Sequence, residues 1–401
     1  MIAMRLMAAL ISAMLAMQAL AAPVAAPSPS RSTFVKLMKV QQYWEQEDYD
    51  AAIADLEALL GKKHDDPYEF ALASQFLAHT YVLLDRPSAA RRVLEAALEK
   101  EDIHFQLLAN LKLFYGQLAL GDEEYELARQ MFEEWLATTM QVADSSQLFS
   151  AAYANYMTQH LDEAEKLVDQ AISRNAAAPD SWHRLHYQVL FDLERYNAAE
   201  LILLHLLERT PANEGHWRLL ANHHLRREDS VKALAALTIA KQIEVLADIE
   251  DLLRIVSLFN VAEAPERGAR MLERALADAK LEPDFEVLRR LGDLLLLSRE
   301  RARAIAALQR AAAVAPDGKT HELLASIWFN DQEWRNAHDA YVSAIEKGGV
   351  DNIDRLYLLA GVSAMRAGMT NEAKSALTEA SRSTALRPQA QAMLRKLTGE
   401  T

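Results

Sequence analysis

One pattern of apolar residues recurs along most of the chain. A small residue is followed four positions later by a large apolar residue, and three positions after that by Ala or another apolar residue. The small residues are Ala52, Ala90, Ala128, Ala164, Ala199, Ala233, Gly268, Ala304, Ala337 and Ala373, at intervals of 33 to 38 residues. Because positions i, i+4 and i+7 share one face of a helix, each occurrence predicts an amphipathic helix.

A second predicted helix lies upstream of each small residue. In one unit, Leu288, Leu291 and Gly292 precede Ala304 with the spacing of a helix face. Several prolines lie between units, where a helix must end: Pro179, Pro211, Pro283 and Pro316. The sequence therefore predicts ten helix–turn–helix units in succession.

This arrangement resembles the tetratricopeptide-repeat (TPR) family, whose units are about 34 residues long. The resemblance covers residues 33–384 and implies an all-α, right-handed α-solenoid of about ten repeats, with the first helix of each pair lining the concave face. Residues 385–401 are predicted to form a C-terminal cap helix and tail. In the fifth unit, Trp182 lies one residue too far from Ala199, which leaves the register of its first helix open.

The composition also favours helices over strands. The 401 residues include only 12 Gly and 11 Pro, and 51% are hydrophobic, with Ala and Leu supplying much of that fraction. Ala and Leu are strong helix formers, whereas strands and their turns need Gly and Pro. So few glycines also imply that few turns require special backbone angles.

The first 32 residues differ from the repeats. Met1 to Arg5 carries one positive charge, Leu6 to Leu20 is apolar, and Ala19-Leu20-Ala21 has the pattern of a cleavage site. We expect a signal peptide over residues 1–21 and a flexible linker over 22–32. The alternative is an uncleaved membrane anchor, although a span needs about 20 apolar residues. The mature chain is expected to be periplasmic, with no transmembrane helix.

Charge and residue types exclude several functions. The net charge of −14 argues against nucleic-acid binding, and the absence of Cys excludes disulfides, thiolate zinc sites and cysteine nucleophiles. No phosphate loop, GxSxG or HExxH motif is present. Six histidines lie close in sequence without recognisable ligand spacing: His183, His186, His205, His216, His223 and His224. We expect no enzymatic activity, cofactor or metal.

The middle of the chain supplies the candidate binding residues. Positions on the first helix of a TPR pair that line the concave face project here onto aromatic, amide and Arg side chains. These are Phe149, Tyr153, Tyr156, Arg184, Gln188, Arg218 and Asn222. Aromatics and Arg suit anchoring contacts, and amides can hydrogen-bond an extended peptide. The hypothesis is a groove for a peptide or partner protein; the alternative is that these side chains only pack against neighbouring helices or face water.

A narrower resemblance concerns the setting. Residues 41–52 (QQYWEQEDYDAA), Trp135, Ser181-Trp182 and Glu346-Lys347-Gly348-Gly349 are similar to exported TPR proteins encoded beside TonB–ExbB–ExbD energy-transduction systems. This implies a scaffold that contacts a TonB-complex subunit and assists TonB-dependent outer-membrane transport. The alternative is a TPR protein that binds envelope polymers or their enzymes, in peptidoglycan or exopolysaccharide biogenesis.

Overall fold

The computed structural model describes residues 27–138 and 143–398, and all regular structure in these ranges is helical. The expected signal peptide lies outside the described residues. The helices divide between two compact units, Met1–Leu206 and Leu207–Thr401, with α11 crossing the boundary. Those of the first unit are α2 (Arg31–Glu45), α3 (Tyr49–Lys62), α4 (Pro67–Leu83), α5 (Pro87–Leu98), α6 (Phe105–Gly121), α7 (Tyr125–Thr138), α8 (Ser145–Met157), α9 (Leu161–Ser173) and α10 (Asp180–Asp192).

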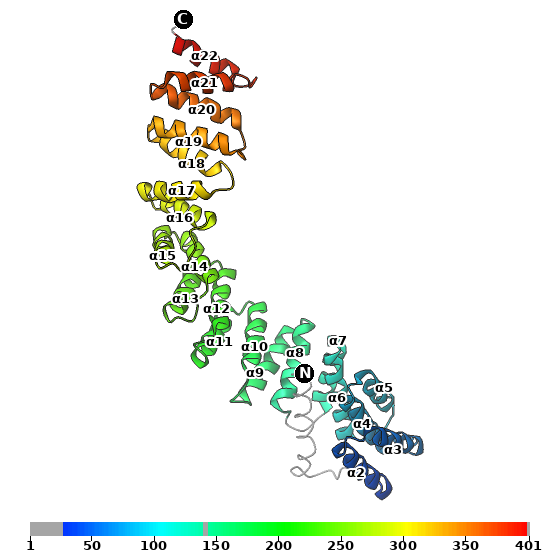
Figure 1. The fold of residues 1–401 in the computed structure, drawn as a ribbon. Coiled ribbons are helices and arrows are strands. Elements are labelled where there is room, and N and C mark those ends of the chain that lie inside the picture. The colour runs from blue at the N-terminus through cyan, green and yellow to red at the C-terminus, as the bar shows by residue number, and fades with distance from the viewer. Residues whose placement is uncertain (1–26, 139–142, 399–401) are drawn as a thin grey trace. The chain divides into compact units, whose positions relative to one another are not determined.

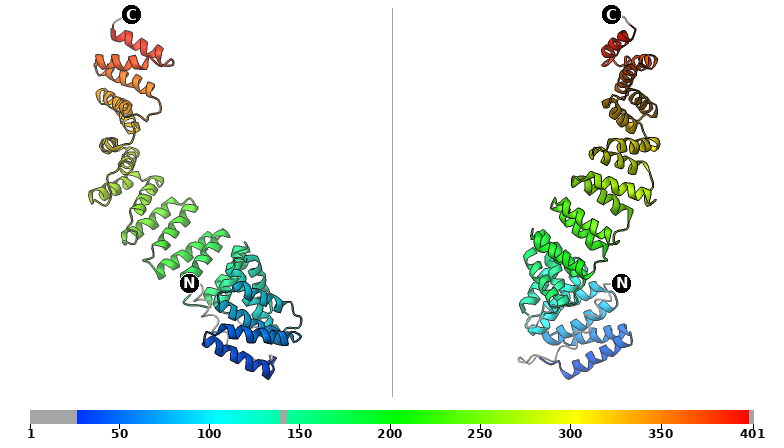
Figure 2. Two further views of the ribbon diagram at one scale, coloured as in Figure 1. Left: turned by 45° about the vertical axis from the view of Figure 1, so that its right-hand side comes forward. Right: turned by 90° about the vertical axis from the view of Figure 1, so that its left-hand side faces the viewer.

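The remaining helices follow the same alternation (Figure 1). They are α11 (Tyr196–Arg209), α12 (Glu214–Arg226), α13 (Ser230–Gln242), α14 (Ile249–Val261), α15 (Pro265–Ala277), α16 (Phe285–Leu297), α17 (Arg301–Val314), α18 (Lys319–Asn330), α19 (Trp334–Lys347), α20 (Ile353–Arg366), α21 (Thr370–Ala380) and α22 (Arg387–Thr398). From α2 to α10, and from α12 to α22, each helix packs against the next (Figure 2). The predicted all-α solenoid of ten helix pairs with a C-terminal cap helix is confirmed.

The turn inside each pair has one fixed geometry. Its central residue adopts a left-handed backbone conformation and lies five positions before the small residue of the second helix. These residues are Glu47, Asp85, Glu123, Gln159, Glu194, Glu228, Glu263, Arg299, Gln332 and Gly368, and the nine that are not Gly have φ between 55° and 64°. The expectation that few turns need special angles was therefore wrong.

A hydrogen bond explains why the turn tolerates this conformation. The amide after the left-handed residue donates to a carbonyl in the last turn of the first helix, as from Asp48 to Tyr43 at 2.9 Å and from Arg86 to Tyr81 at 2.8 Å. The bond satisfies a carbonyl that the end of the helix would leave without a partner. A side chain in this conformation costs about 1 kcal/mol relative to Gly.

Close helix contact explains the small residues of the repeat. A Cβ placed on Gly292 of α16 would lie 2.6 Å from Leu308 Cγ on α17, so only Gly fits beside this large residue. The preceding pair differs at both positions. On α14, the buried Val256 stands where α16 has Gly292, and on α15, Gly268 takes the place of the usual Ala. A Cβ on Gly268 would lie 3.2 Å from the Val256 carbonyl oxygen. A side chain at position 268 would therefore crowd the backbone of α14.

A buried carboxylate fixes the start of α2. Glu69 of α4 accepts hydrogen bonds of 2.6 Å from the Ser30 amide and the Thr33 hydroxyl, and Lys63 Nζ lies 2.6 Å from it. Burial alone would raise the pKa of Glu69, but these donors outweigh it and lower the pKa to about 2. The first helix of the array is therefore held by charge as well as by its apolar side.

The loops that follow α17 and α19 touch each other. The Gly318 amide donates to the Gly348 carbonyl at 2.7 Å, and Lys347 Nζ donates to the Ala312 carbonyl at 2.9 Å. Gly349 has a φ of 71°, which favours Gly. The Glu346-Lys347-Gly348-Gly349 motif therefore has a structural role, because it joins two successive helix pairs.

Candidate partner-binding face

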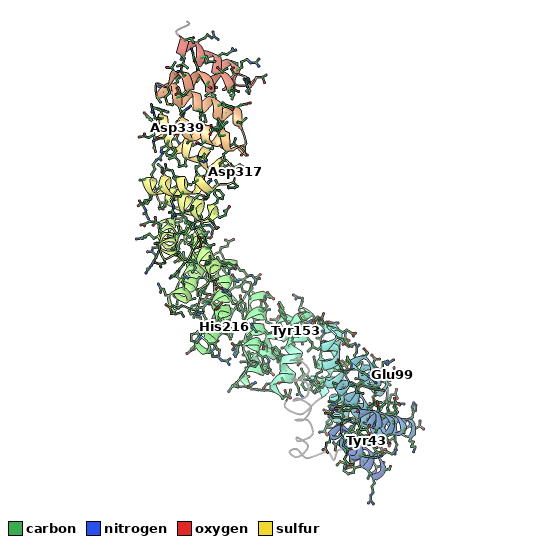
Figure 3. The ribbon with its side chains drawn as sticks, viewed as in Figure 1. Tyr43, Glu99, Tyr153, His216, Asp317 and Asp339 are labelled. Atoms are coloured by element: carbon green, nitrogen blue, oxygen red, sulfur yellow. The ribbon has the colours of Figure 1, made fainter. Side chains whose placement is uncertain are left out.

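In the first unit, the first helices of successive pairs lie beside one another. Contacts join α2 to α4, α4 to α6, α6 to α8 and α8 to α10. We call the surface formed by these five helices the first-helix face. It carries five of the seven predicted site residues: Phe149, Tyr153 and Tyr156 on α8, and Arg184 and Gln188 on α10. Figure 3 marks the position of Tyr153 in this unit.

Two of the aromatic side chains on α8 contact other rings. Phe149 stacks on Trp182 of α10, with ring centroids 4.8 Å apart and an angle of 8° between the planes. Tyr153 meets Tyr125 of α7 edge to face, at a centroid distance of 6.1 Å. Because Phe149 and Tyr153 are only half-buried, part of each ring stays open to a ligand. The rings are held in place before any ligand arrives, which lowers the entropy lost on binding.

A carboxylate joins α8 and α10 on the same face. The Tyr156 hydroxyl donates to Asp192 Oδ2 at 3.1 Å, and Gln188 Nε2 donates to Asp192 Oδ1 at 2.9 Å. The phenol and the amide are half-buried. This bond uses only the nitrogen of the Gln188 amide, and its side-chain oxygen is of the type that accepts from a peptide N–H.

Arg184 is the predicted site residue of this face that carries a positive charge. It is exposed on α10 and forms no ion pair with any residue in the described ranges. An exposed guanidinium can bind a carboxylate through two parallel hydrogen bonds. The face therefore combines half-buried aromatic rings, an amide, the Asp192 carboxylate and a guanidinium that has no ion-pair partner among the described residues.

Arg218 and Asn222 lie on α12 in the second unit, apart from the other five. Arg218 donates to both oxygens of Asp251, at 3.2 and 2.7 Å, and Glu214 and Asp248 lie 2.9 and 3.5 Å from it. These hydrogen bonds raise the pKa of the Arg218 guanidinium, and Asp251 is almost fully buried. Arg218 is thus engaged within its own unit. Asn222 is exposed.

A second aromatic group lies on α2 and α4. Trp44 stacks on Phe76 at a centroid distance of 5.3 Å and contacts His79 at 4.7 Å, while its indole N–H donates to the Thr80 hydroxyl at 3.0 Å. Burial lowers the pKa of His79 to about 4, so its imidazole is neutral at pH 7. This group extends the aromatic character of the first-helix face towards α2.

Most of the six histidines noted in the sequence have buried side chains. His183, His186, His216, His223 and His224 are buried, whereas His205 is exposed. Burial lowers the pKa of His186. The ring of His216 is hydrogen bonded to Thr210 at 3.0 Å. His223 and His224 lie with Glu200 of α11 in a group whose possible ligand atoms are within 4.8 Å of one another, so burial does not by itself decide between packing and metal binding for these two.

Three side chains that contact the predicted site residues were not predicted as part of the site. Trp182 was noted for its displaced register and in the resemblance to exported TPR proteins, and neither Asp192 of α10 nor Tyr125 of α7 was named as a candidate. The fifth pair has the same geometry as the sixth, since α10 and α12 each begin 14 residues before the left-handed residue of their turn. Trp182 therefore comes one position earlier on its helix than Trp217 does, and this turns its ring towards Phe149.

No family model matches the chain, and no curated protein matches it. The crystal structure of YrrB, a TPR protein with an unusual peptide-binding site, is similar over 50% of this chain and 97% of its own, with 18% identity and a TM-score of 0.41. The C-terminal part of a TPR repeat-containing protein from Cytophaga hutchinsonii is similar over 70% of this chain and 95% of its own, with 14% identity and a TM-score of 0.39.

PilF of Pseudomonas aeruginosa is similar over 53% of this chain and 91% of its own, with 17% identity and a TM-score of 0.35. At TM-scores below 0.5, these likenesses carry no argument about the partners of this chain. Within the described ranges, the helices are all too short or too polar to cross a membrane.

Proposed function

We propose that this chain is a non-catalytic periplasmic scaffold that holds a peptide or protein segment on its first-helix face. We further propose that it does so as an accessory of TonB-dependent outer-membrane transport, with a TonB-complex subunit as the partner. The setting rests on the resemblance of the leader and repeat motifs described above. The binding role rests on the chemistry of α8 and α10.

The proposal rests on one observation: α8 and α10 together present partly exposed aromatic rings and an exposed guanidinium. Phe149 and Tyr153 offer half-open rings held by neighbouring rings, and Arg184 offers a guanidinium without an ion-pair partner among the described residues. Aromatic and Arg side chains contribute most of the binding energy at many protein interfaces. The ligand that suits this face is a segment with an apolar side chain near a carboxylate.

The experiment is capture of partners by the immobilised mature chain from a periplasmic and membrane extract, followed by mass spectrometry. Recovery of TonB, ExbB or ExbD in proportion to bait supports the proposal. Recovery of only cell-wall enzymes or glycans would favour the alternative role in envelope-polymer biogenesis. Recovery of none of these would contradict both.

A further inference from the structure

The outward side of α2 is apolar although α2 is the first described helix of the array. Phe34, Val35 and Met38 are 55%, 58% and 45% exposed, while Leu37 and Val40 on the opposite side are buried against the first unit. Positions 34, 35 and 38 lie on one side of a helix. Three large apolar side chains therefore form a continuous exposed stripe at this end.

The last helix of the second unit has the opposite character. Met393, Leu394 and Leu397 of α22 are half-buried and pack against Leu358 and Leu377. Its exposed side carries polar and charged residues: Gln389, Gln391, Arg395 and Lys396. Repeat arrays need a polar outer side on their end helices to stay soluble. The side of α2 lacks one, so its apolar stripe needs another explanation.

Two charged residues lie on the same stripe, at equal distances from its centre. Arg31 lies seven positions before Met38 and Glu45 seven positions after it, a spacing of two helix turns that keeps all three on one side. Both charged side chains are exposed, and neither forms an ion pair with another residue of the described ranges. The stripe thus runs from a cation, through apolar residues and the amides of Gln41 and Gln42, to an anion.

We propose that this side of α2 is a self-association surface whose occupant is α2 of a second copy of the chain, packed antiparallel about a two-fold axis at Met38. An isologous contact of this kind must be complementary to itself. In the antiparallel arrangement, Arg31 of each copy faces Glu45 of the other, and Met38 faces its own equivalent. A parallel arrangement would place like charges together, so the charges select the antiparallel one.

The size of the contact determines its strength. One pair of 15-residue helices covers less area than the roughly 1,200–2,000 Å² of a standard stable interface. The dimer is therefore weak, with a dissociation constant on the order of micromolar or higher, and its population depends on protein concentration.

The first test is sedimentation velocity of the purified full chain over about a hundredfold range of concentration. Met38→Glu places two carboxylates together at the axis, and we expect it to raise the dissociation constant at least about tenfold. Val231→Glu on α13 is the matched control, because Val231 is also an exposed apolar residue, at 65% against 45% for Met38. The control should leave the constant unchanged. A chain that stays monomeric throughout overturns the proposal.

A charge exchange tests the antiparallel geometry. Arg31→Glu alone should weaken the dimer several-fold, and Arg31→Glu combined with Glu45→Arg should restore it. Since both residues are exposed, neither change should alter folding, and circular dichroism verifies this. Failure of the double variant to recover would overturn the antiparallel arrangement.

Cross-linking gives an independent readout, because the chain has no Cys of its own. A Met38→Cys chain should form a disulfide-linked dimer under mild oxidation, since the two thiols meet at the axis. A Val231→Cys chain should cross-link at least about tenfold more slowly, limited by random collision. Equal rates for the two chains would contradict the proposal.

Discussion

Two arginines at equivalent positions of neighbouring helix pairs have different surroundings. Arg184 on α10 and Arg218 on α12 each lie four residues after the first residue of their helix. Arg218 forms two hydrogen bonds to the buried Asp251, whereas Arg184 is exposed and has no ion-pair partner among the described residues. The same residue type at the same repeat position therefore pairs with a buried carboxylate in one unit and is exposed in the other.

Arg218 is paired because a later helix, α14, supplies a carboxylate to it. Asp251 lies in the first turn of α14, 33 residues after Arg218, where it is buried and close enough to accept from the guanidinium. Repeat position alone predicts which side of a helix a residue occupies. It does not predict whether a neighbouring element neutralises it, and that decides whether the residue can serve a ligand.

The largest effect should come from reversing the charge of Arg218. Arg218→Glu would leave Asp251 buried beside a second carboxylate, with Glu214 and Asp248 close by. We expect a loss of about 3 kcal/mol in the free energy of unfolding, since a broken buried pair leaves an uncompensated charge. Arg184→Glu should change it by less than about 0.5 kcal/mol. Urea unfolding followed by circular dichroism measures both, and equal losses would remove the distinction.

Acid should affect the first unit through Glu69. Its folded-state pKa of about 2 lies below the ordinary value of 4.5, so its contribution is full above pH 4.5 and is lost as the pH falls towards 2. The difference between the two pKa values corresponds to about 3 kcal/mol. Unfolding free energies of the native chain and Glu69→Gln should therefore differ most at neutral pH and converge in acid. A difference that does not depend on pH would contradict this account of the α2 anchor.

A smaller effect is expected from the Tyr156 phenol of the first-helix face. Tyr156→Phe removes the hydrogen bond to Asp192 and keeps the ring, so the first unit should lose about 1 kcal/mol. Asn222→Ala on α12 is exposed and serves as the control, with a change within about 0.5 kcal/mol. Thermal unfolding would detect the difference. An equal loss from Asn222→Ala would show that the hydrogen bond between Tyr156 and Asp192 does not explain the loss of stability in Tyr156→Phe.

The smallest effect is expected in the turns that follow α10 and α12, and it should be the same in both. Glu194 and Glu228 have φ values of 59° and 60°, in the turns after α10 and α12. Replacing either by Gly relieves the left-handed strain, and we expect a gain of about 0.5–1 kcal/mol at each position. Urea midpoints for the two variants would verify this. Unequal gains would mean that the turns differ more than their angles indicate.

The fold could be predicted from the sequence because each helix pair repeats the same small and large residues. The left-handed turns could not be predicted, because nine of the ten turns use Glu, Asp, Gln or Arg and leave no trace in the Gly count. In these turns, hydrogen bonding and helix packing override local preference.

The candidate site could be predicted only in part. Spacing placed Phe149, Tyr153, Tyr156, Arg184 and Gln188 on neighbouring helices of the first unit. The stack of Phe149 on Trp182 and the carboxylate of Asp192 depend on how two helices pack, and periodicity does not contain that information. Engagement of Arg218 by Asp251 depends on a residue 33 positions away. The role of these residues in binding stays a prediction.

The most direct test of this account measures how much TonB-complex subunit the mature chain captures when a single arginine is reversed in charge. Arg184→Glu is compared with Arg310→Glu, which changes an exposed arginine of α17 in the second unit by the same charge. The account predicts a loss of at least about tenfold for Arg184→Glu, equivalent to about 1.4 kcal/mol, and no loss for Arg310→Glu. Equal capture by the two variants would contradict the assignment of the first-helix face as the binding surface.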